Sequence, residues 1–230
     1  MDEGRPLTAL VIGSSDGIGR ALVRRLSTGR YRVISVSRRA LEATGVEHHV
    51  LDAASEGFRD ELARVLGERA VDLCVYCAGV GELFDPTDLS MDARAARVNF
   101  VGLVDAAAAV IPAMVRRNAG HFIGLSSIGD GVSPEAPAYG ATKAGASAYL
   151  EGLALALRPK GVFVSNVRFG FVDTKMAKSP VKPMMISVDA AVDALERVIA
   201  RRPMVLSVPK PMSWLVGVLQ GLLRARLWVG

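Results

Sequence analysis

Tyr139 and Lys143 are the two side chains in this sequence whose types and spacing best suit proton transfer. Residues four apart lie on the same face of a helix. A free tyrosine has a pKa of about 10, and a nearby cation favours its phenolate, which helps it to exchange protons at neutral pH. Just upstream, Ser126 and Ser127 follow the strand-like run His121–Leu125. A serine hydroxyl at that position can hold a substrate carbonyl oxygen while the tyrosine protonates it.

A glycine-rich turn follows the first apolar run of the chain, Leu7–Ile12. It reads Gly13-Ser14-Ser15-Asp16-Gly17-Ile18-Gly19 and opens a helix-like stretch. Glycines allow a tight turn and a close approach of the backbone to a pyrophosphate, and the helix N-terminus attracts the anion. The spacing is G-x-x-x-G-x-G rather than the G-x-G-x-x-G of many dinucleotide folds. Its place on the first strand of the chain predicts a dinucleotide site.

Short β-branched runs alternate with longer stretches of helical period. The strand-like runs are Leu7–Ile12, Arg32–Val36, His49–Leu51, Val71–Tyr76, His121–Leu125 and Val162–Val167. The helix-like runs include Gly19–Ser27, Phe58–Leu66, Met91–Arg117, Ala138–Leu157 and, capped by Ser187, Val188–Ala200. Such alternation requires parallel strands with right-handed crossovers. The sequence therefore predicts an α/β fold: a single-domain, Rossmann-type, doubly wound parallel β-sheet with helices on both faces and ligands at the carboxyl ends of its strands.

Length and composition favour one domain over residues 1–230, half of which are hydrophobic. We expect a nucleotide-binding half to about residue 125, a catalytic part to about residue 208 and a separate tail. No signal-peptide core follows the N-terminus, so a cytoplasmic protein is expected. Cys74 and Cys77 have an odd separation in a strand-like run, which directs them to opposite faces and disfavours a disulfide. The three histidines lack ligand spacing, so no metal site is expected.

Positive charge is concentrated in the last third of the chain. Residues 158–230 carry 12 Lys/Arg and 4 Asp/Glu, whereas residues 1–157 carry 16 and 19. This excess suits an anionic substrate group, an anionic membrane surface or a solvated face, and these alternatives stay open. Nucleic acid is not an expected partner, because the basic residues are not interleaved with stacking aromatic residues.

Together these features make the sequence resemble the short-chain dehydrogenase/reductase superfamily, from Leu7 to about Met176. The similar features are the Gly13/Gly17/Gly19 turn, Asp52 after the third strand, Ala78-Gly79 after the fourth, Asn99 in the long helix, Ser127, Tyr139, Lys143 and Gly170-Phe171-Val172-Asp173-Thr174 past the sixth strand. Each motif alone is weak evidence. Their order and spacing together are specific.

The resemblance implies a role for each catalytic residue. Tyr139 would be the general acid in reduction and the base in oxidation, and Ser127 would orient and polarise the carbonyl. Lys143 would bind the nicotinamide ribose and lower the pKa of Tyr139, while Asn99 would hold a water that links Lys143 to solvent. The resemblance also implies cofactor contacts from the glycine turn and the later strand ends: Gly13, Ser15, Asp16, Gly17, Ile18, Gly19, Ser37, Arg38, Asp52, Ala53, Cys77, Ala78, Gly79, Tyr139, Lys143, Gly170, Val172 and Thr174.

Three positions depart from the family pattern or leave it ambiguous. Cys77 stands where the family usually has Asn, and Phe169 stands where it often has Pro. The usual distance to Tyr139 would select Ser126 as the catalytic serine, whereas alignment of the strand selects Ser127. We favour Ser127, because a buried strand cannot slip by one residue without reversing its faces.

The end of the second strand-like run bears on the choice between the two nicotinamide cofactors. An acidic residue there accepts hydrogen bonds from the adenosine ribose and repels a 2′-phosphate. This chain has Ser37 where similar NAD-binding enzymes carry Asp, followed by Arg38 and Arg39. A small hydroxyl and a guanidinium suit a phosphate, which Arg can bind through two parallel hydrogen bonds. We expect NADP(H) to be favoured over NAD(H); the alternative is that both arginines are only surface charges.

The tail, about residues 209–230, differs from the ending of many family members. Its apolar run, Met212–Leu223, is shorter than the ~20 residues that a membrane-spanning helix needs. Arg224, Arg226 and Trp228 follow it. Three alternatives stay open: packing on the body or on a partner subunit, peripheral contact with a membrane with Trp and Arg at headgroup level, or a flap over the substrate.

The sequence thus predicts an NADP(H)-dependent oxidoreductase that transfers a hydride between nicotinamide and a carbonyl or secondary alcohol, and that forms a homo-oligomer. Phe84, Phe169 and Phe171, with the tail, favour an apolar small-molecule substrate, whereas the basic last third favours an acidic one. Two alternatives stay open: a dinucleotide-binding or sensing protein with weak catalysis, and an epimerase or dehydratase on the same fold.

Overall fold

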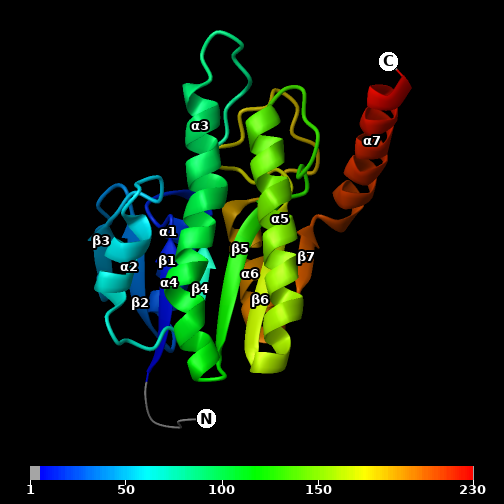
Figure 1. Cartoon of the computed structure of the whole chain (residues 1–230). Coiled ribbons are helices and arrows are strands. Elements are labelled where there is room, and N and C mark those ends of the chain that lie inside the picture. The colour runs from blue at the N-terminus through cyan, green and yellow to red at the C-terminus, as the bar shows by residue number, and fades with distance from the viewer. Residues whose placement is uncertain (1–5, 230) are drawn as a thin grey trace.

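The structure is a computed structural model that describes residues 6–229, with side chains to Leu227. The described residues form one sheet of seven parallel strands in the order β3-β2-β1-β4-β5-β6-β7. The strands are β1 (Leu7–Ile12), β2 (Tyr31–Ser37), β3 (Val46–Val50), β4 (Leu73–Tyr76), β5 (Gly120–Ser127), β6 (Val162–Phe169) and β7 (Val205–Val208). The strand order reverses direction between β1 and β4, which confirms the predicted doubly wound sheet (Figure 1).

Helices cover both faces of this sheet, as predicted (Figure 1). The α-helices of the structure are α1 (Gly17–Ser27), α2 (Phe58–Leu66), α3 (Ser90–Ala96), α4 (Gly102–Arg116), α5 (Pro137–Leu157), α6 (Val188–Arg201) and α7 (Lys210–Val229). The helices α2, α4 and α5 pack on one face, and α1 and α6 pack on the other. The predicted cap of α6 is confirmed, since the Ser187 hydroxyl accepts a hydrogen bond from the Ala190 N–H.

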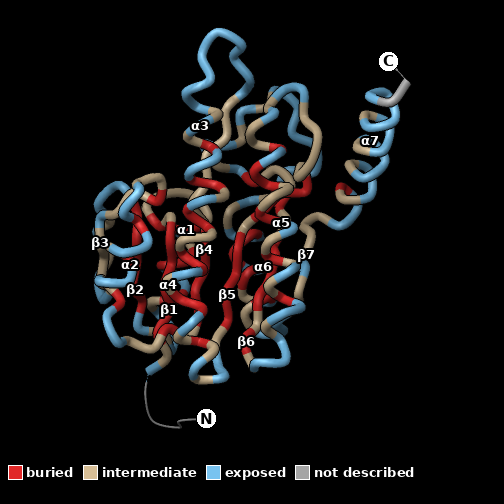
Figure 2. The backbone as a smooth tube through the Cα atoms, in the orientation of Figure 1, coloured by how far each residue is buried: buried red, intermediate tan, exposed pale blue. Residues whose placement is uncertain are grey.

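The buried strands supply both cores because their side chains alternate between the two faces. In β1, Leu10 and Ile12 belong to the core beneath α2, α4 and α5, while Ala9 and Val11 belong to the core beneath α1 and α6. Figure 2 shows these buried residues in red, along the strands of the sheet and along parts of the neighbouring helices. This alternation fixes which residues at each strand end face the site.

The cysteines follow the same rule. Cys74 lies in the core beneath α2, α4 and α5, whereas Cys77 packs against the opposite core. Both are free thiols, which confirms the expectation from their odd spacing. Among the described residues, no group of His, Cys, Asp and Glu is arranged to hold a metal ion.

Two elements differ from the sequence-based expectation. The long helix predicted over Met91–Arg117 runs from α3 to α4 through a π-helical segment, Arg97–Val101. The strand β7 was not among the predicted strands; it pairs with β6 between Pro203 and Pro209, so the prolines that interrupt this region bound a strand at the sheet edge.

One helical stretch within residues 6–229, Ser90–Arg116, is long and apolar enough by composition to cross a membrane. Half of its most apolar window is buried inside the protein, where residues of α4 such as Leu103, Ala107 and Val110 pack in the core. This stretch therefore has the burial of a core helix. The helix α7 does not meet the same criterion.

Candidate active site

The carboxyl ends of β1 and β4 approach each other at the point where the strand order reverses. Gly13 has a φ of +86°, and a Cβ there would overlap the backbone of Ala78. A Cβ on Gly19 would overlap the Gly13 carbonyl, so α1 packs directly on the turn. These two glycines are required by space, because no side chain fits where the turn meets β4 and α1.

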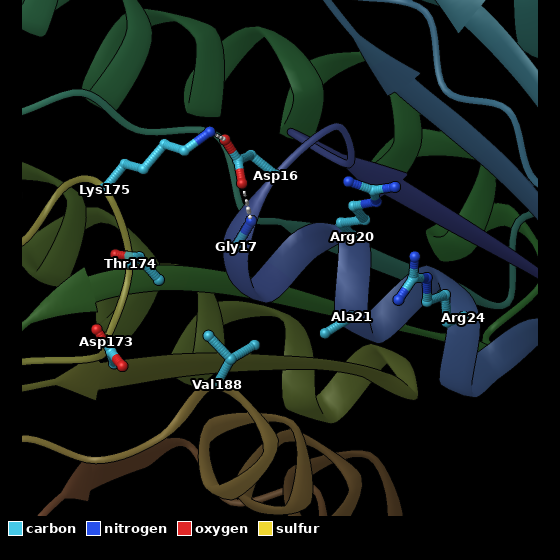
Figure 3. Close-up of a pocket in the computed structure, with 9 residues that line it drawn as sticks. All are labelled: Asp16, Gly17, Arg20, Ala21, Arg24, Asp173, Thr174, Lys175 and Val188. Atoms are coloured by element: carbon cyan, nitrogen blue, oxygen red, sulfur yellow. Dashed lines mark hydrogen bonds and ion pairs between the residues drawn. The ribbon is translucent and has the colours of Figure 1, made fainter.

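Asp16 closes the start of α1 and forms the centre of an ion-pair cluster. Its carboxylate accepts a hydrogen bond from the Gly17 N–H at 2.9 Å and pairs with Lys175 at 3.2 Å (Figure 3). It also pairs with Arg39 at 3.3 Å. The Gly17 N–H and the Lys175 ammonium, with Arg39, hold the pKa of Asp16 below its usual value. Asp16 thus lies in the turn as predicted, but its visible role is to cap the helix. Lys175 and Arg39 were not among the predicted site residues.

A pocket of about 440 Å³ opens beside this cluster (Figure 3). Its lining comes from the first turns of α1, the loop after β6 and the start of α6: Asp16, Gly17, Arg20, Ala21, Arg24, Asp173, Thr174, Lys175 and Val188. The methyl group of Thr174 lies 3.2 Å from the position that a Cβ on Gly17 would take. The structure therefore brings the Gly170–Thr174 segment against the glycine turn, as the sequence predicts for one cofactor site.

A chain of polar contacts connects the glycine turn to the end of β2. The buried hydroxyls of Ser14 and Ser35 are 2.8 Å apart, and Ser35 lies 2.7 Å from Nδ1 of His48. Nε2 of His48 lies 3.1 Å from the Arg39 carbonyl, to which the Ser37 hydroxyl also donates. Burial lowers the pKa of His48, so the neutral ring fits this role with its proton on Nε2.

These polar contacts fix the backbone that carries Arg38 and Arg39, whose side chains are exposed. Sequence reasoning missed His48 because it was considered only as a metal ligand. The signal that could have found it is its register, since β2 and β3 pair with Ser35 opposite His48.

Asp52 and Ala53 lie just past the end of β3, the edge strand that pairs with β2. The Asp52 carboxylate accepts a hydrogen bond from the Ala54 N–H and pairs with Arg94 at 3.0 Å. Burial opposes ionisation of Asp52, but the Ala54 N–H and Arg94 outweigh it and lower the pKa. Ala53 is buried against Gly102, so its role in the structure is to support the long helix.

The two candidate serines point to opposite sides of β5. The Ser126 hydroxyl donates to the side-chain oxygen of Asn166 within the core. The Ser127 hydroxyl accepts a hydrogen bond from the Gly129 N–H at 3.0 Å and donates one to the Phe169 carbonyl at 3.4 Å. It is close enough to the Tyr139 phenol to oppose the rise in the pKa of that group. The structure therefore brings Ser127 and Tyr139 together, and it places Ser126 away from them.

Lys143 is one turn beyond Tyr139 on α5 and is only 5% exposed. Its ammonium donates to the Leu125 carbonyl at 2.9 Å and lies 5.8 Å from the centre of the Tyr139 ring. Burial lowers the pKa of Lys143 to about 8. A lysine with this pKa exchanges its proton readily near neutral pH.

The electrostatics of Tyr139 differ from the expectation. Burial raises its pKa, the Ser127 hydroxyl acts against this, and the carboxylate of Asp130 raises the pKa further. Lys143 was expected to lower it, but its ammonium is bound to Leu125. The phenol therefore holds its proton at neutral pH, as a general acid must.

Asn99 lies in the π-helical segment and is 2% exposed. Its side-chain oxygen accepts from the Val80 N–H, and its amide donates to the Val80 carbonyl and to the Thr142 hydroxyl. A Cβ on Gly79 would lie 3.5 Å from the Asn99 oxygen and 3.6 Å from the Lys143 ammonium. Asn99 thus holds the Gly79–Val80 backbone next to Lys143. The π-helical segment allows this because it turns one residue out of the regular helical register.

The departures from the family pattern have structural explanations. Burial raises the pKa of Cys77 to about 12, so this residue is a neutral apolar side chain close to Lys143. Phe169 is buried in the core beneath α1 and α6, so the expectation that it lines an apolar substrate site is wrong. Gly170 contacts Met212 of α7, and Val172 is buried beside the bridge to Ile186. Gly170 and Val172 thus help to hold the loop after β6 in place.

Comparisons with known proteins agree with this arrangement. A family model described as short chain dehydrogenase matches residues 7–184. An uncharacterized oxidoreductase of Myxococcus xanthus is 33% identical over 221 residues, 88% of this chain and 87% of that protein. A probable NADP-dependent dehydrogenase of Haemophilus influenzae is 35% identical over 179 residues, 71% of this chain and 70% of that protein. A solved short chain dehydrogenase of Burkholderia cenocepacia in complex with NADP has a TM-score of 0.81 and 25% identity, over 98% of this chain and 96% of that one.

The opposite orientations of Ser126 and Ser127 predict opposite effects of their removal. Ser127→Ala should lower kcat/KM for a carbonyl substrate by about 100-fold, because it removes the hydroxyl beside Tyr139. Ser126→Ala should keep kcat/KM within about tenfold and lower stability by about 1 kcal/mol, because it removes a core hydrogen bond. Steady-state kinetics and thermal unfolding of both variants measure this. A larger kinetic loss in Ser126→Ala would contradict the assignment.

Proposed function

This chain belongs to the short-chain dehydrogenase family of oxidoreductases, and we propose on that premise that it is an NADP(H)-dependent carbonyl reductase or alcohol dehydrogenase. The observation that carries the proposal is the position of the Ser127 hydroxyl beside the half-buried phenol of Tyr139, with the buried ammonium of Lys143 5.8 Å from the centre of the Tyr139 ring. These groups lie at the same end of the sheet as the glycine turn.

The residues present fit a dinucleotide. Gly13 and Gly19 let the turn pack closely on Ala78 and on the start of α1, and α1 begins at that turn. The partial positive charge of the helix N-terminus attracts a pyrophosphate. When bound, a reduced nicotinamide supplies a hydride to the carbonyl carbon of the substrate. Lys143, whose ammonium lies beside Gly79, would bind the nicotinamide ribose.

The proton of the reaction would come from this chain. Ser127 donates a hydrogen bond to the carbonyl oxygen and polarises it, while Tyr139 transfers its phenolic proton to that oxygen, so that an alcohol forms. Because burial keeps Tyr139 protonated, the acid is ready before the substrate arrives. Lys143, with a pKa lowered to about 8, can return a proton to Tyr139 after the transfer.

The preference for NADP(H) rests on the end of β2. Ser37 donates its hydroxyl to the Arg39 carbonyl, so no carboxylate stands where a 2′-phosphate would be repelled. Arg38 is exposed beside it, and Arg39 is held toward the glycine turn by Asp16. Selectivity for the phosphate requires an attraction and the absence of a repelling charge. The two guanidiniums at this turn provide the attraction, and Ser37 avoids the repulsion that a carboxylate would cause.

The substrate side of the cleft suits a mainly apolar molecule. A Cβ on Gly81 would touch the Tyr139 ring, so the loop after β4 lies directly on the phenol. Met176 approaches Gly79 from the loop after β6. A cation from the same loop, Lys178, pairs with Glu82 and is therefore already neutralised. We propose a small carbonyl or alcohol with an apolar body.

Replacing Tyr139 by phenylalanine should remove turnover and leave NADPH binding nearly unchanged. The change deletes the transferable proton but keeps the ring, so kcat should fall by about 100-fold or more. The matched control is Tyr149→Phe on the same helix, where the ring packs edge-on to Phe100. NADPH oxidation with a panel of ketones, quinones and acyl or lipid-linked carbonyls measures the effect. Turnover of Tyr139→Phe within about tenfold of wild type would overturn the role of Tyr139.

Replacing Arg38 by alanine should weaken NADPH binding selectively. A charge-assisted hydrogen bond contributes about 1.5–3 kcal/mol, so the dissociation constant should rise about 10- to 150-fold, while that of NADH changes little. Arg32→Ala is the matched control, because Arg32 lies at the other end of β2 and pairs with Glu47. Equal affinity of the wild-type protein for both cofactors, or an equal loss for both in Arg38→Ala, would show that Arg38 is only a surface charge.

A further inference from the structure

The helix α7 is held to the protein by one side only. Met212, at its start, is buried against Gly170. Two turns later, Gln220 accepts a hydrogen bond from the Val132 N–H at 2.8 Å and donates one to the Val132 carbonyl at 2.9 Å. The rest of α7 leans away from the sheet and is mostly exposed (Figures 1 and 2).

The opposite side of α7 is an apolar face, which we define as Trp214, Leu215, Val218, Leu219 and Leu222. Their spacing of three and four residues places them on one side of the helix. Trp214 is 82% exposed and Leu222 is 65% exposed, and the other three are more than half exposed. A contiguous row of large exposed apolar side chains is the mark of a binding surface.

The charge on α7 has a single sign. Lys210, Arg224 and Arg226 are its charged residues, and no acidic residue follows Glu196 in the sequence. Arg226 continues the row of Leu222, four residues further along the same side. A basic helix end beside an apolar face containing tryptophan is typical of helices that lie in the interface of an anionic membrane.

The charge on α7 also favours an anionic membrane, rather than a second copy of the chain, as the partner of the apolar face. If two α7 helices paired through their apolar faces, the three cations of each would meet only cations, because α7 offers no carboxylate to neutralise them. Lipid phosphates and carboxylates supply the missing anions. We propose that the apolar face of α7 docks on an anionic lipid bilayer, with the helix in the plane of the interface and its arginines at the headgroups.

This docking would bring the substrate side of the protein to the bilayer. Gln220 is bonded to Val132, and the neighbouring Gly131 packs against Gly140 at the start of α5, next to Tyr139. Gly170, against Met212, follows directly from the strand that pairs with Ser127. Docking of α7 on the bilayer does not depend on turnover, so a measurement of membrane binding alone tests it.

The test is co-sedimentation of the full chain, with NADPH present, with vesicles of 30% phosphatidylserine in phosphatidylcholine and with vesicles of phosphatidylcholine alone. We expect binding to the anionic vesicles, weakened by 0.5 M salt, and little binding to the neutral ones. In a Trp228→Phe background, the fluorescence of Trp214 should shift to the blue on binding. Equal or absent binding to the two vesicle types would overturn the proposal.

Paired variants separate the contributions of charge and apolar surface. Arg224→Glu with Arg226→Glu should weaken the partition by at least about 30-fold, and Leu215→Ser with Leu219→Ser by about tenfold. Arg59→Glu with Arg64→Glu on α2 is the control with the same change of net charge, and it should change the partition less than threefold. If instead light scattering shows a dimer that the Leu215/Leu219 variant converts to monomers, a second copy covers this face and the lipid proposal is wrong.

Discussion

The contact of Gly13 with the backbone of Ala78 is the constraint on which the rest of the site depends. It lies where the strand order reverses between β1 and β4, and no side chain fits between the two backbones. Because the turns after the two strands can touch, the start of α1 and the Gly79 region lie side by side at the same end of the sheet. In doubly wound sheets this end is the place where ligands bind. A bulkier residue at position 13 would separate the phosphate end of the site from its catalytic end.

Burial determines the chemistry at the catalytic end. The same desolvation that raises the pKa of Tyr139 lowers the pKa of Lys143 to about 8, so the phenol holds its proton more firmly than the ammonium does. A phenol that stays protonated and a lysine that can release a proton near neutral pH form a suitable donor and relay. At the other end, Asp16 is neutralised by Lys175 and Arg39, which allows an acidic cap to stand beside an anion site.

Local patterns predicted most of the fold, and they pointed to the residues that the structure brings together at the candidate site. Alignment of the strand with the family pattern selected Ser127, and the four-residue spacing placed Lys143 beside Tyr139. Contacts between distant segments could not be predicted: Lys175 meets Asp16 only because the loop after β6 returns to α1. The π-helical segment at Asn99 was missed because its sequence has an ordinary helical period. Phe169 was misjudged because the sequence does not show which face of β6 it occupies.

The most direct test of the central claim, that the site at the strand ends carries out hydride transfer, uses NADPH in which both hydrogens at C4 of the nicotinamide are replaced by deuterium. Mass spectrometry would follow the label into the alcohols formed from a panel of apolar ketones, quinones and lipid-linked carbonyls. The account predicts one deuterium at the carbinol carbon of at least one product. If the wild-type protein binds NADPH but transfers no deuterium to any member of the panel, the chain binds the dinucleotide without reducing carbonyls, and the account is wrong.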